Sequence, residues 1–378
     1  MKVLALALTA AIVFGFTGCR SERVLSDEEK DRIQTRFQAC INDRGVSAAV
    51  YAVYRDEVIF DGGGGMAADT LQNGSDVAYG VASLSKQVTA AAVMQLYEDG
   101  RLDITDPIGK YFPDYRYGDK ISITHLLSHR SGIPDYMVNT AKGKVVISVD
   151  QGGESYVLVD VENTAEENRQ IIRDFFLSRE LLFEPGDEFD YSDSNFALLA
   201  EIVKMVSGMD YHDYVREHIF EPLGMEHTDF IDDYDKEKIT KVAATDRTEF
   251  SMDYYTVKGA EYGCGDVLTT PQDWYRWYKG LTGGEVVGKG AYELMTTNYS
   301  VRDEMSYGFG LVIYDESDSK TVYHYGYIPS YYSAAIYIPE YDYFEAVFSN
   351  HADGSPQKLA ADLAEYFGSV IGIRLVDI

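Results

Sequence analysis

Runs of β-branched and aromatic residues gather near both ends of the chain. Residues 46–54 and 57–61 are two such runs, and Arg55 with Asp56 between them predicts a hairpin turn. Three more runs lie close to the C-terminus, at residues 321–325, 331–338 and 343–349, each bounded by Gly, Pro, Asn or Asp. The pattern therefore predicts strands near both termini.

Hydrophobic residues at helical spacing dominate the middle of the chain. The predicted helices there are residues 87–99, 123–128, 166–181, 195–207, 211–219 and 271–281, joined by Gly, Pro and Asp turns. Two more helices are expected at 28–41 and 358–367, the second with Ser355 as N-cap and Pro356 at its first position. The acidic stretch 150–163, which contains a Gly pair, is expected to form a surface loop or ribbon.

This order of elements predicts a mixed α/β fold. An antiparallel sheet is built from both chain termini and flanked by helices, and it packs against an inserted, mostly helical region at about residues 85–290. The functional site is expected in the cleft between the two parts. The hydrophobic fraction of 46% is normal for a chain with a buried core.

The charge balance excludes one class of partner. The chain carries 33 Lys and Arg residues against 62 Asp and Glu residues, which gives a net charge of -29. A surface this anionic repels a phosphate backbone, so nucleic acid is not expected as a partner.

The first residues have the features of an export signal. Met1 and Lys2 form a short basic start, residues 3–16 are apolar, and no later stretch is apolar enough to span a bilayer. The run ends Phe16-Thr17-Gly18-Cys19, which resembles the lipobox of bacterial lipoproteins, where the Cys receives the lipid. Phe16 departs from the usual Leu, and the alternative is an ordinary signal peptide with an incidental Cys19. We expect a signal peptide at 1–18, a lipoprotein tether at 19–27, and an exported protein anchored in the bacterial cell envelope by its lipid.

Two cysteines remain after this segment, Cys40 and Cys264. They could pair in an exported protein, but their sequence contexts differ and no sequence fixes the distance between two thiols. We expect both to be buried and unpaired.

A Ser-x-x-Lys pattern occurs three times. Ser317 lies in a turn-like acidic run, and Ser355 is explained by its helix cap. Ser83 differs because Ser83-Leu-Ser-Lys86 opens an amphipathic helix. Residues i and i+3 share one helix face, so Lys86 would lie beside the Ser83 hydroxyl and could activate it. The free N–H groups at a helix start also suit a developing oxyanion.

Four further motifs follow Ser83-Leu-Ser-Lys86 along the chain. They are Leu126-Leu-Ser-His-Arg-Ser-Gly-Ile-Pro134, Phe189-Asp-Tyr-Ser-Asp-Ser-Asn195, Tyr262-Gly-Cys-Gly-Asp-Val-Leu268 and His324-Tyr-Gly326. In this order the chain, from about Gly45 onward, resembles the serine β-lactamase and D,D-peptidase (penicillin-binding protein-like) family, in its class C β-lactamase branch, which also contains esterases and D-aminopeptidases. The resemblance implies one serine hydrolase domain over residues 28–378.

The resemblance also implies a role for each matching residue. Ser83 would be the acylated nucleophile, Lys86 its base or electrostatic partner, and Tyr191 the shuttle that carries a proton to the leaving group. The oxyanion hole would be the backbone N–H groups of Ser83 and Tyr327. The implied substrate-binding residues are Asp193, His324 and Gly326. No cofactor is implied, and the partner is a small-molecule or peptide substrate; the oligomeric state stays open.

Two residues depart from the family pattern. Asp193 stands where Asn is usual, and its carboxylate would favour a charged Lys86, so our hypothesis is that Tyr191 is the working base. His324 stands where Lys is usual. An unperturbed imidazole is charged only below about pH 6.5. Its affinity for a substrate carboxylate should therefore decrease as the pH rises. This favours a D,D-carboxypeptidase or D-peptidase over an efficient β-lactamase.

Three other interpretations were weighed. His125 and His129 have the i, i+4 spacing of zinc ligands, but no Glu lies between them and no third ligand is evident, so we predict no metal site and interpret the segment as a helix that packs on the core and ends at Ser131-Gly-Ile-Pro. An esterase of the same family is the second. A catalytically inactive, penicillin-binding-like lipoprotein is the third, and Asp193 makes it conceivable.

Overall fold

The computed structural model describes residues 24–141, 144–149, 156–160, 162–244, 257–300, 306–316, 319–328, 331–351 and 356–372. The predicted signal peptide and Cys19, and also Ser317 and Ser355, lie outside the described residues. Within the described part, no helix has both the length and the hydropathy needed to cross a bilayer.

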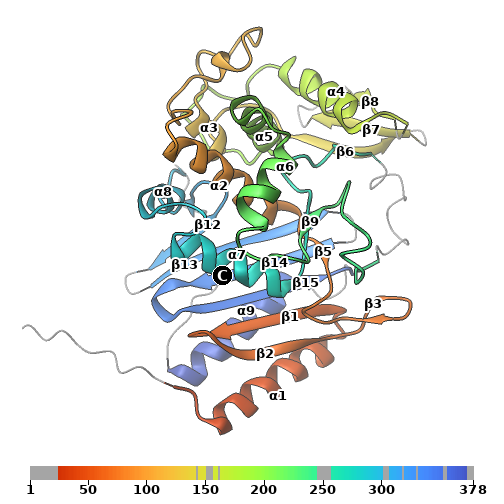
Figure 1. Ribbon diagram of the computed structural model, residues 1–378, viewed down its shortest axis with the longest axis vertical. Coiled ribbons are helices and arrows are strands. Elements are labelled where there is room, and N and C mark those ends of the chain that lie inside the picture. Colours follow the sequence, from red (N-terminus) through yellow and green to blue (C-terminus); the bar gives the residue numbers. More distant parts are fainter. Residues whose placement is uncertain are drawn as a thin grey trace, which may run out of the picture.

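A seven-stranded antiparallel sheet forms the centre of the molecule (Figure 1). Its strands, in spatial order, are β11 (Ser306–Tyr307), β12 (Val312–Glu316), β13 (Ser319–Ile328), β14 (Tyr331–Ile338), β15 (Tyr343–Ser349), β1 (Ala48–Tyr54) and β2 (Glu57–Gly64). The strand β1 pairs with β15, with Ala48 opposite Ser349. The sheet is therefore built from both ends of the chain, as the sequence predicts.

The predicted hairpin joins β1 and β2 through two residues. Arg55 and Asp56 have φ angles of 52° and 61°. Two successive left-handed residues match the right-handed twist of the flanking strands, which is why such turns suit two-residue hairpins. The turn therefore forms at the predicted place.

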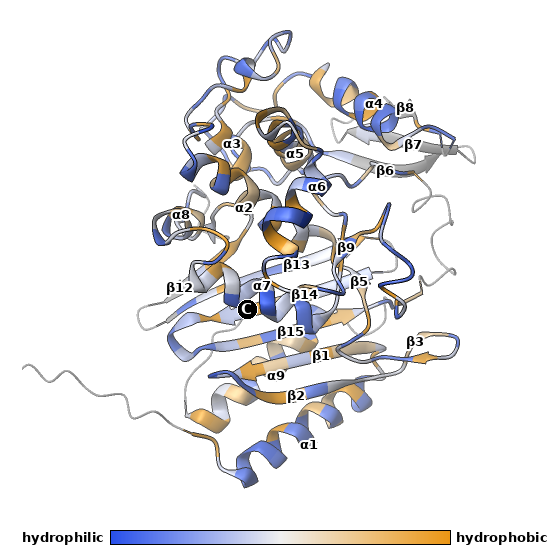
Figure 2. Ribbon diagram, in the orientation of Figure 1, coloured by the Kyte–Doolittle hydropathy of each residue, from blue (hydrophilic) through white to orange (hydrophobic). Residues whose placement is uncertain are grey.

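Two helices cover one face of the sheet, α1 (Asp27–Arg44) and α9 (Pro356–Ile371) (Figure 1). Their buried residues, which include Phe37 and Phe367, form one hydrophobic cluster with Val50 and Ile336 of the sheet. Figure 2 shows hydrophobic and hydrophilic residues alternating along α1, as expected for a helix with one buried face. A capping box between Ser26 and Glu29 starts α1.

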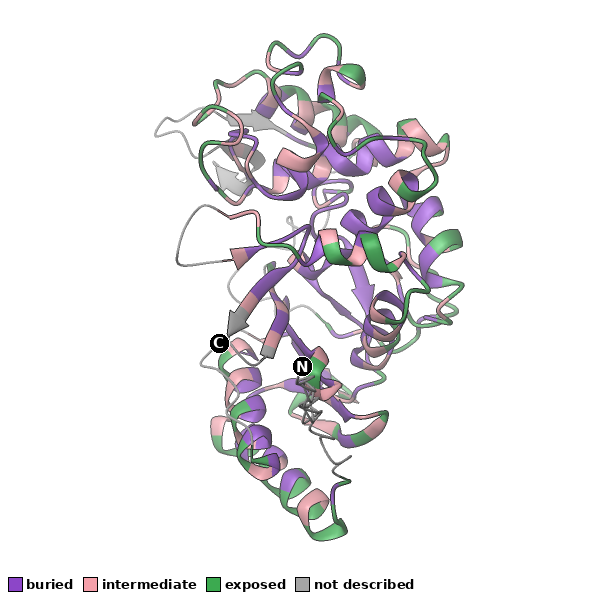
Figure 3. Ribbon diagram, turned by 90° about the vertical axis from the view of Figure 1, so that its left-hand side faces the viewer, coloured by how far each residue is buried: buried purple, intermediate pink, exposed green. Residues whose placement is uncertain are grey.

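The helical region covers the opposite face of the sheet. Its helices are α2 (Ser85–Glu98), α3 (Ile123–Leu127), α4 (Ala165–Leu177), α5 (Asp193–Ser207), α6 (Tyr211–Val215), α7 (Pro271–Gly283) and α8 (Lys289–Met295). Eleven of the 14 residues of α2 are buried, so this helix is enclosed on nearly every side. The middle of the molecule is largely buried in Figure 3.

Small strands join the helices of this region. They are β3 (Met66–Ala68), β4 (Leu71–Gln72), β5 (Tyr79–Gly80), β9 (Asp229–Phe230) and β10 (Val267–Thr269), together with the three-stranded sheet β6 (Tyr136–Ala141), β7 (Lys144–Val149) and β8 (Tyr156–Leu158). The last sheet was not predicted beyond the expectation of a loop or ribbon at 150–163, where β8 lies. Single turns of 3-10 helix lie at Ile108–Lys110 and Pro339–Tyr341.

Most predicted helices end one to four residues from their predicted ends, and three of these differences concern α4, α6 and α3. The helix α4 stops at Leu177, because the Ser178 hydroxyl donates to the Phe175 carbonyl oxygen (2.7 Å) and caps the last turn. The helix α6 continues as a π-helix over Arg216–Phe220. The helix α3 stops at Leu127, since His129 has a left-handed φ of 54°. His125 and His129 are therefore not stacked one helical turn apart.

Candidate active site

Ser83 lies in a single turn of 3-10 helix, Ala82–Leu84, directly before α2. The sequence predicts it at the start of the helix itself. Ala82 explains the difference, because its φ of 49° is in the left-handed region that non-glycine residues rarely adopt and that marks local strain. The predicted contact between the two residues is nevertheless present, since Lys86 Nζ lies 2.9 Å from Ser83 Oγ.

The strand β13 packs directly against this turn at Gly326. A Cβ atom on Gly326 would lie 2.2 Å from the Val81 carbonyl oxygen and 3.1 Å from Ala82 Cβ. The turn is also held from the sheet, because the Ser333 hydroxyl donates to the Val81 carbonyl oxygen (2.8 Å). Gly326 thus permits the close approach of two backbones. Tyr327 follows it on β13, beside the turn, and its side chain is 51% exposed.

Lys86 is fully buried and has three oxygen contacts. Its Nζ lies 2.9 Å from Ser83 Oγ, 2.8 Å from the Cys264 carbonyl oxygen and 2.6 Å from Asp193 Oδ1. An ammonium group has three N–H donors, so these contacts satisfy the charged form completely. Burial alone would lower the pKa of Lys86, but the charge of Asp193 above all raises it well above its usual value.

Asp193 begins α5 and keeps part of its side chain, 28%, exposed to solvent. A second carboxyl lies next to it, since the Asp193 backbone N–H donates to Asp135 Oδ1 (2.6 Å). Burial and then the Asp193 charge raise the pKa of Asp135 to about 8. Both effects favour the protonated form of Asp135, whereas Asp193 Oδ1 forms the ion pair with Lys86.

The Tyr191 ring lies between the lysine and two histidines. Lys86 Nζ is 4.9 Å from the ring centroid, and the His129 and His324 rings lie 4.2 and 6.2 Å from it. Burial raises the pKa of Tyr191, while the charge of Lys86 lowers it in part. The resting side chain is thus a neutral phenol beside the Lys86 ammonium that contacts Ser83 Oγ.

His324 ends a buried chain of hydrogen bonds. The Ser192 N–H donates to His129 Nδ1 (3.1 Å), so His129 Nε2 carries the proton that it donates to Tyr307 Oη (3.2 Å). Tyr307 can then donate to His324 Nε2 (3.2 Å), and His324 Nδ1–H donates to the Tyr325 carbonyl oxygen (2.6 Å). Both nitrogens of His324 are used within the protein.

This arrangement corrects the expected behaviour of His324. Burial and the Lys86 charge lower its pKa to about 3, and its side chain is almost completely buried. The imidazole is therefore neutral throughout the physiological range, and the expected loss of charge near pH 6.5 does not apply. Burial and the same lysine also lower the pKa of His129 well below its usual value.

The segment from Tyr262 to Asp266 holds Lys86 from the side opposite Ser83. Besides the Cys264 carbonyl contact, the Gly263 carbonyl oxygen accepts a hydrogen bond from the Thr89 hydroxyl of α2 (2.6 Å). Asp266 anchors the segment, since its Oδ2 accepts from the Gly263 N–H (3.1 Å) and lies 2.8 Å from His212 Nε2. The sequence motif marked this segment, but only the structure shows that it contributes a backbone oxygen.

One group of described side chains has the spacing of a metal site. Ligand atoms of Asp193, Glu261 and Cys264 lie within 4.8 Å of one another. One feature opposes metal binding there, because burial raises the pKa of the Cys264 thiol well above its usual value and so disfavours the thiolate that binds a metal. Cys264 and Cys40 are both buried and unpaired, as expected.

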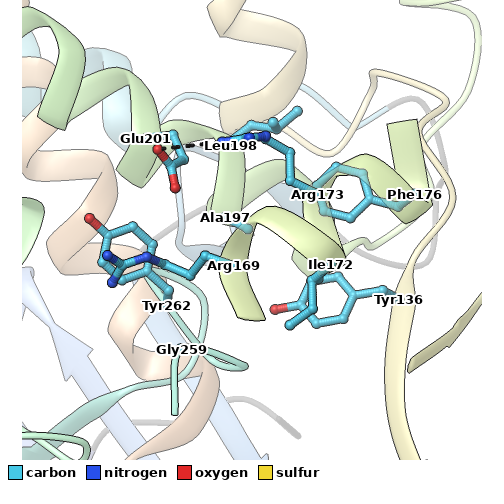
Figure 4. A pocket seen from close by; sticks show the side chains of 10 residues that line it. All are labelled: Tyr136, Arg169, Ile172, Arg173, Phe176, Ala197, Leu198, Glu201, Gly259 and Tyr262. Atoms are coloured by element: carbon cyan, nitrogen blue, oxygen red, sulfur yellow. Dashed lines mark ion pairs between the residues drawn. The ribbon is translucent and has the colours of Figure 1, made fainter. Parts of the chain in front are cut away.

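A small pocket lies behind the site, between α4 and α5 (Figure 4). It is lined by Glu201, which faces Arg173 at 3.9 Å, and by Tyr136, whose hydroxyl donates to the Ala260 carbonyl oxygen (2.5 Å) and contacts Cys264 Sγ (3.2 Å). Tyr136 thus links this pocket to the segment that contacts Lys86. Its charged groups already have partners, since Arg173 faces Glu201 and Arg169 pairs with Glu166 and Asp210, which is typical of a packing contact between elements.

Comparison with known proteins identifies the family. The sequence model of the Beta-lactamase family matches residues 33–366, which is most of the chain. The chain belongs to the beta-lactamase family. The Bacillus subtilis (strain 168) protein PbpX, which carries a penicillin-binding protein name, is 29% identical over 300 residues, or 79% of this chain and 69% of that protein.

Two solved structures share the fold of this chain. A penicillin-binding protein from Bacillus halodurans has a TM-score of 0.73 at 22% identity and covers 87% of this chain and 99% of its own. The D-amino acid amidase from Ochrobactrum anthropi SV3, complexed with L-phenylalanine amide, has a TM-score of 0.70 at 21% identity and covers 90% and 99%. The mixed α/β architecture described above is thus the beta-lactamase family fold.

The close approach at Gly326 predicts a specific defect. In Gly326→Ala the added methyl would force β13 away from the turn that carries Ser83, because the atoms it meets at 2.2 Å include a backbone oxygen. We expect the rate of Ser83 labelling by a fluorophosphonate to fall at least tenfold. Gly290→Ala, where a Cβ would meet nothing within 4 Å, is the control. Equal labelling rates in the two variants would contradict this role.

The contact between His212 and Asp266 predicts a pH-dependent stability. Burial lowers the pKa of His212, but hydrogen bonding to Asp233 and Asp266 and their charges outweigh it and raise the pKa to about 9. A raised pKa contributes stability that is complete below the unfolded value, about 6.5, and disappears as the pH rises through 9. His212→Gln should therefore be less stable than wild type at pH 6, by about 3 kcal/mol, and nearly equal at pH 10.

Urea unfolding at several pH values tests this expectation. The exposed residue His227 provides the matched control, because His227→Gln makes the same substitution at the surface. A His212→Gln deficit that stays constant from pH 6 to pH 10 would show that its charge contributes nothing.

Proposed function

We propose that the chain is a serine hydrolase that cleaves a peptide, amide or ester carbonyl through an acyl-enzyme on Ser83. The observation that carries the proposal is the contact of Ser83 Oγ with Lys86 Nζ at 2.9 Å, next to the Tyr191 phenol. Membership of the beta-lactamase family supports hydrolysis as the reaction class. Within that class a D,D-carboxypeptidase or D-peptidase fits best, since the similar proteins carry penicillin-binding and D-amino acid amidase names.

Tyr191, rather than Lys86, accepts the Ser83 proton in this proposal. Lys86 already has three oxygen contacts as an ammonium, and a protonated amine cannot take up another proton. Tyr191 is a neutral phenol, so it takes the Ser83 proton as it passes its own proton to the leaving atom. Lys86 lowers the pKa of Tyr191 and so stabilises any negative charge on its oxygen.

The two half-reactions then balance. Ser83 Oγ bonds to the carbonyl carbon, the bond to the leaving nitrogen or oxygen breaks, and the leaving group departs with the Tyr191 proton. Water attacks the acyl-enzyme by the same route, giving one proton to Tyr191 while Tyr191 returns a proton to Ser83 Oγ. The backbone N–H groups of Ser83 and Tyr327 hold the oxyanion in both steps.

Two substitutions test this mechanism. Ser83→Ala should abolish covalent labelling by a fluorophosphonate, and Tyr191→Phe should lower the acylation rate at least 100-fold, since it removes the only group that relays the proton. Tyr278→Phe removes a hydroxyl from a buried tyrosine of α7, outside the site, and should change the rate less than twofold. Stopped-flow release of 4-nitrophenol from a short-chain ester measures these rates. A normal acylation rate in Tyr191→Phe would eliminate the relay.

A non-catalytic binding lipoprotein is the alternative that one observation favours. The ion pair of Lys86 with Asp193 holds the lysine charged, which removes it as a base. If neither a fluorophosphonate nor a penicillin labels Ser83 in folded protein, the binding function replaces the hydrolase. An esterase of the same family is distinguished by its preference for esters over amides in the same assay.

We also propose that the protein is exported and lipid-anchored through Cys19. The support is the segment Met1–Lys2, its apolar continuation and Phe16-Thr17-Gly18-Cys19. In a bacterial host the protein should partition with membranes and carry a lipid-modified N-terminal Cys, and Cys19→Ser should release it from the membrane fraction. Intact mass of the purified protein measures the modification. Soluble wild-type protein with an unmodified N-terminus would rule out the anchor.

A further inference from the structure

The Asp193 carboxylate lies within reach of an acyl group on Ser83. The distances from Lys86 Nζ to Ser83 Oγ and to Asp193 Oδ1, 2.9 and 2.6 Å, place that carboxylate oxygen at most about 5.5 Å from the nucleophile. A substituent on the carbon next to the scissile carbonyl is only two bonds beyond the atom that Ser83 attacks. Lys86 is fully buried, whereas Asp193 retains 28% exposure, so an incoming molecule can contact the carboxylate directly.

A carboxylate at this position can only accept hydrogen bonds. Lys86 Nζ contacts this carboxylate at 2.6 Å on the nucleophile side, and the Asp193 backbone N–H donates to Asp135, whose protonated form is favoured by burial. Asp193 therefore repels a carbonyl oxygen or a carboxylate on the substrate and attracts an N–H donor, most strongly a charged one.

The charges around the nucleophile favour a cation as well. Lys86 is the cation whose charge lowers the pKa of Tyr191, Tyr307 and His324. Opposite it are two carboxylates, Asp193 and Glu261, whose charges both raise the pKa of the buried Cys264. The two histidines beside Tyr191 are neutral. Two carboxylates thus stand against one lysine, so the described charges beside Ser83 sum to a negative value.

The same neutral histidines leave no cation for a substrate carboxylate. His324, the residue expected to bind one, has both ring nitrogens occupied by protein groups. The protein as a whole carries a net charge of -29, which raises the local concentration of cations and lowers that of anions near its surface. The local contacts and the long-range field point to the same class of substrate.

We propose that Asp193 selects substrates whose acyl group carries a free, positively charged amine beside the scissile carbonyl. The substrate class is then the amino-terminal residue of a peptide, or an amino-acid amide or ester, which selects the D-peptidase over the D,D-carboxypeptidase of the proposed function. This inference rests on the proposed hydrolase function, and Asp193 acts in it as a specificity-determining residue that touches the substrate amine.

Three 4-nitrophenyl esters of matched size test the proposal. The glycyl ester presents an ammonium group where the propanoyl ester has a methyl group, and the hemisuccinate presents a carboxylate. Each kcat/KM, measured at pH 6.5 where an α-amine is largely protonated, is divided by the spontaneous hydrolysis rate of the same ester. We expect the glycyl ester to be preferred over the propanoyl ester at least tenfold, and the hemisuccinate to be the poorest.

The matched variant is Asp193→Asn, which keeps the shape and removes the charge. We expect it to lose at least tenfold of the preference for the glycyl ester and to accept the hemisuccinate better. Asp99→Asn, which removes the same charge from the exposed end of α2, should leave all three ratios unchanged and so controls for the overall field. Unchanged ratios in Asp193→Asn would overturn the proposal.

A second measurement needs no variant. Glycinamide, propanamide and succinamate compete with the propanoyl ester for wild-type enzyme, and glycinamide should inhibit at least tenfold better than propanamide. Equal inhibition by the two, together with hydrolysis of the propanoyl ester through Ser83, would overturn the substrate class while leaving the hydrolase intact. If none of the three esters reacts faster with wild type than with Ser83→Ala, the hydrolase function itself fails.

Discussion

The charge of one enclosed lysine is the constraint on which the rest of the site depends. Lys86 has no access to water, so each of its three N–H donors needs an oxygen from the protein. Those oxygens come from three separate parts of the chain: the turn before α2, the start of α5 and the loop before β10. An unpaired buried ammonium would be strongly destabilising, so the charge itself holds these segments together. Ser83 and Asp193 are placed with respect to each other by their common contact with Lys86.

Local geometry explains which parts could be predicted from sequence. Period-2 and period-3.6 patterns indicated the strands at both termini and most helices, because each pattern is set by neighbours along the chain. The contact of Lys86 with Ser83 belongs to the same class, since it spans three residues. The 3-10 turn at Ser83 was missed because it depends on the left-handed Ala82, and no residue type at that position signals a positive φ.

Long-range contacts explain what the sequence could not reveal. Tyr307 connects His129 to His324, yet in a chain with 31 tyrosines nothing distinguishes it before folding. The same contacts changed the interpretation of His324, whose expected charge rested on an unperturbed imidazole. Burial beside Lys86 lowers the pKa of His324 and so removes the expected charge. No local sequence pattern indicates that a side chain will be buried next to a lysine. The role of the Cys264 carbonyl was equally hidden, since every residue carries a backbone oxygen.

The pairing of β1 with β15 has a consequence for how the protein matures. The Ser349 hydroxyl donates to the Ser47 carbonyl oxygen across 302 positions of sequence. The pairing of β1 with β15 therefore forms only after nearly the whole chain is available. Pairings this distant are slow to form, because the loop entropy is lost before the contacts are gained. The turn bearing Ser83 also packs on β13, one of the last strands to be synthesised. During synthesis, Ser83 is therefore present long before the strand against which its turn packs. We expect the site to form only after the last strands have been synthesised and have folded.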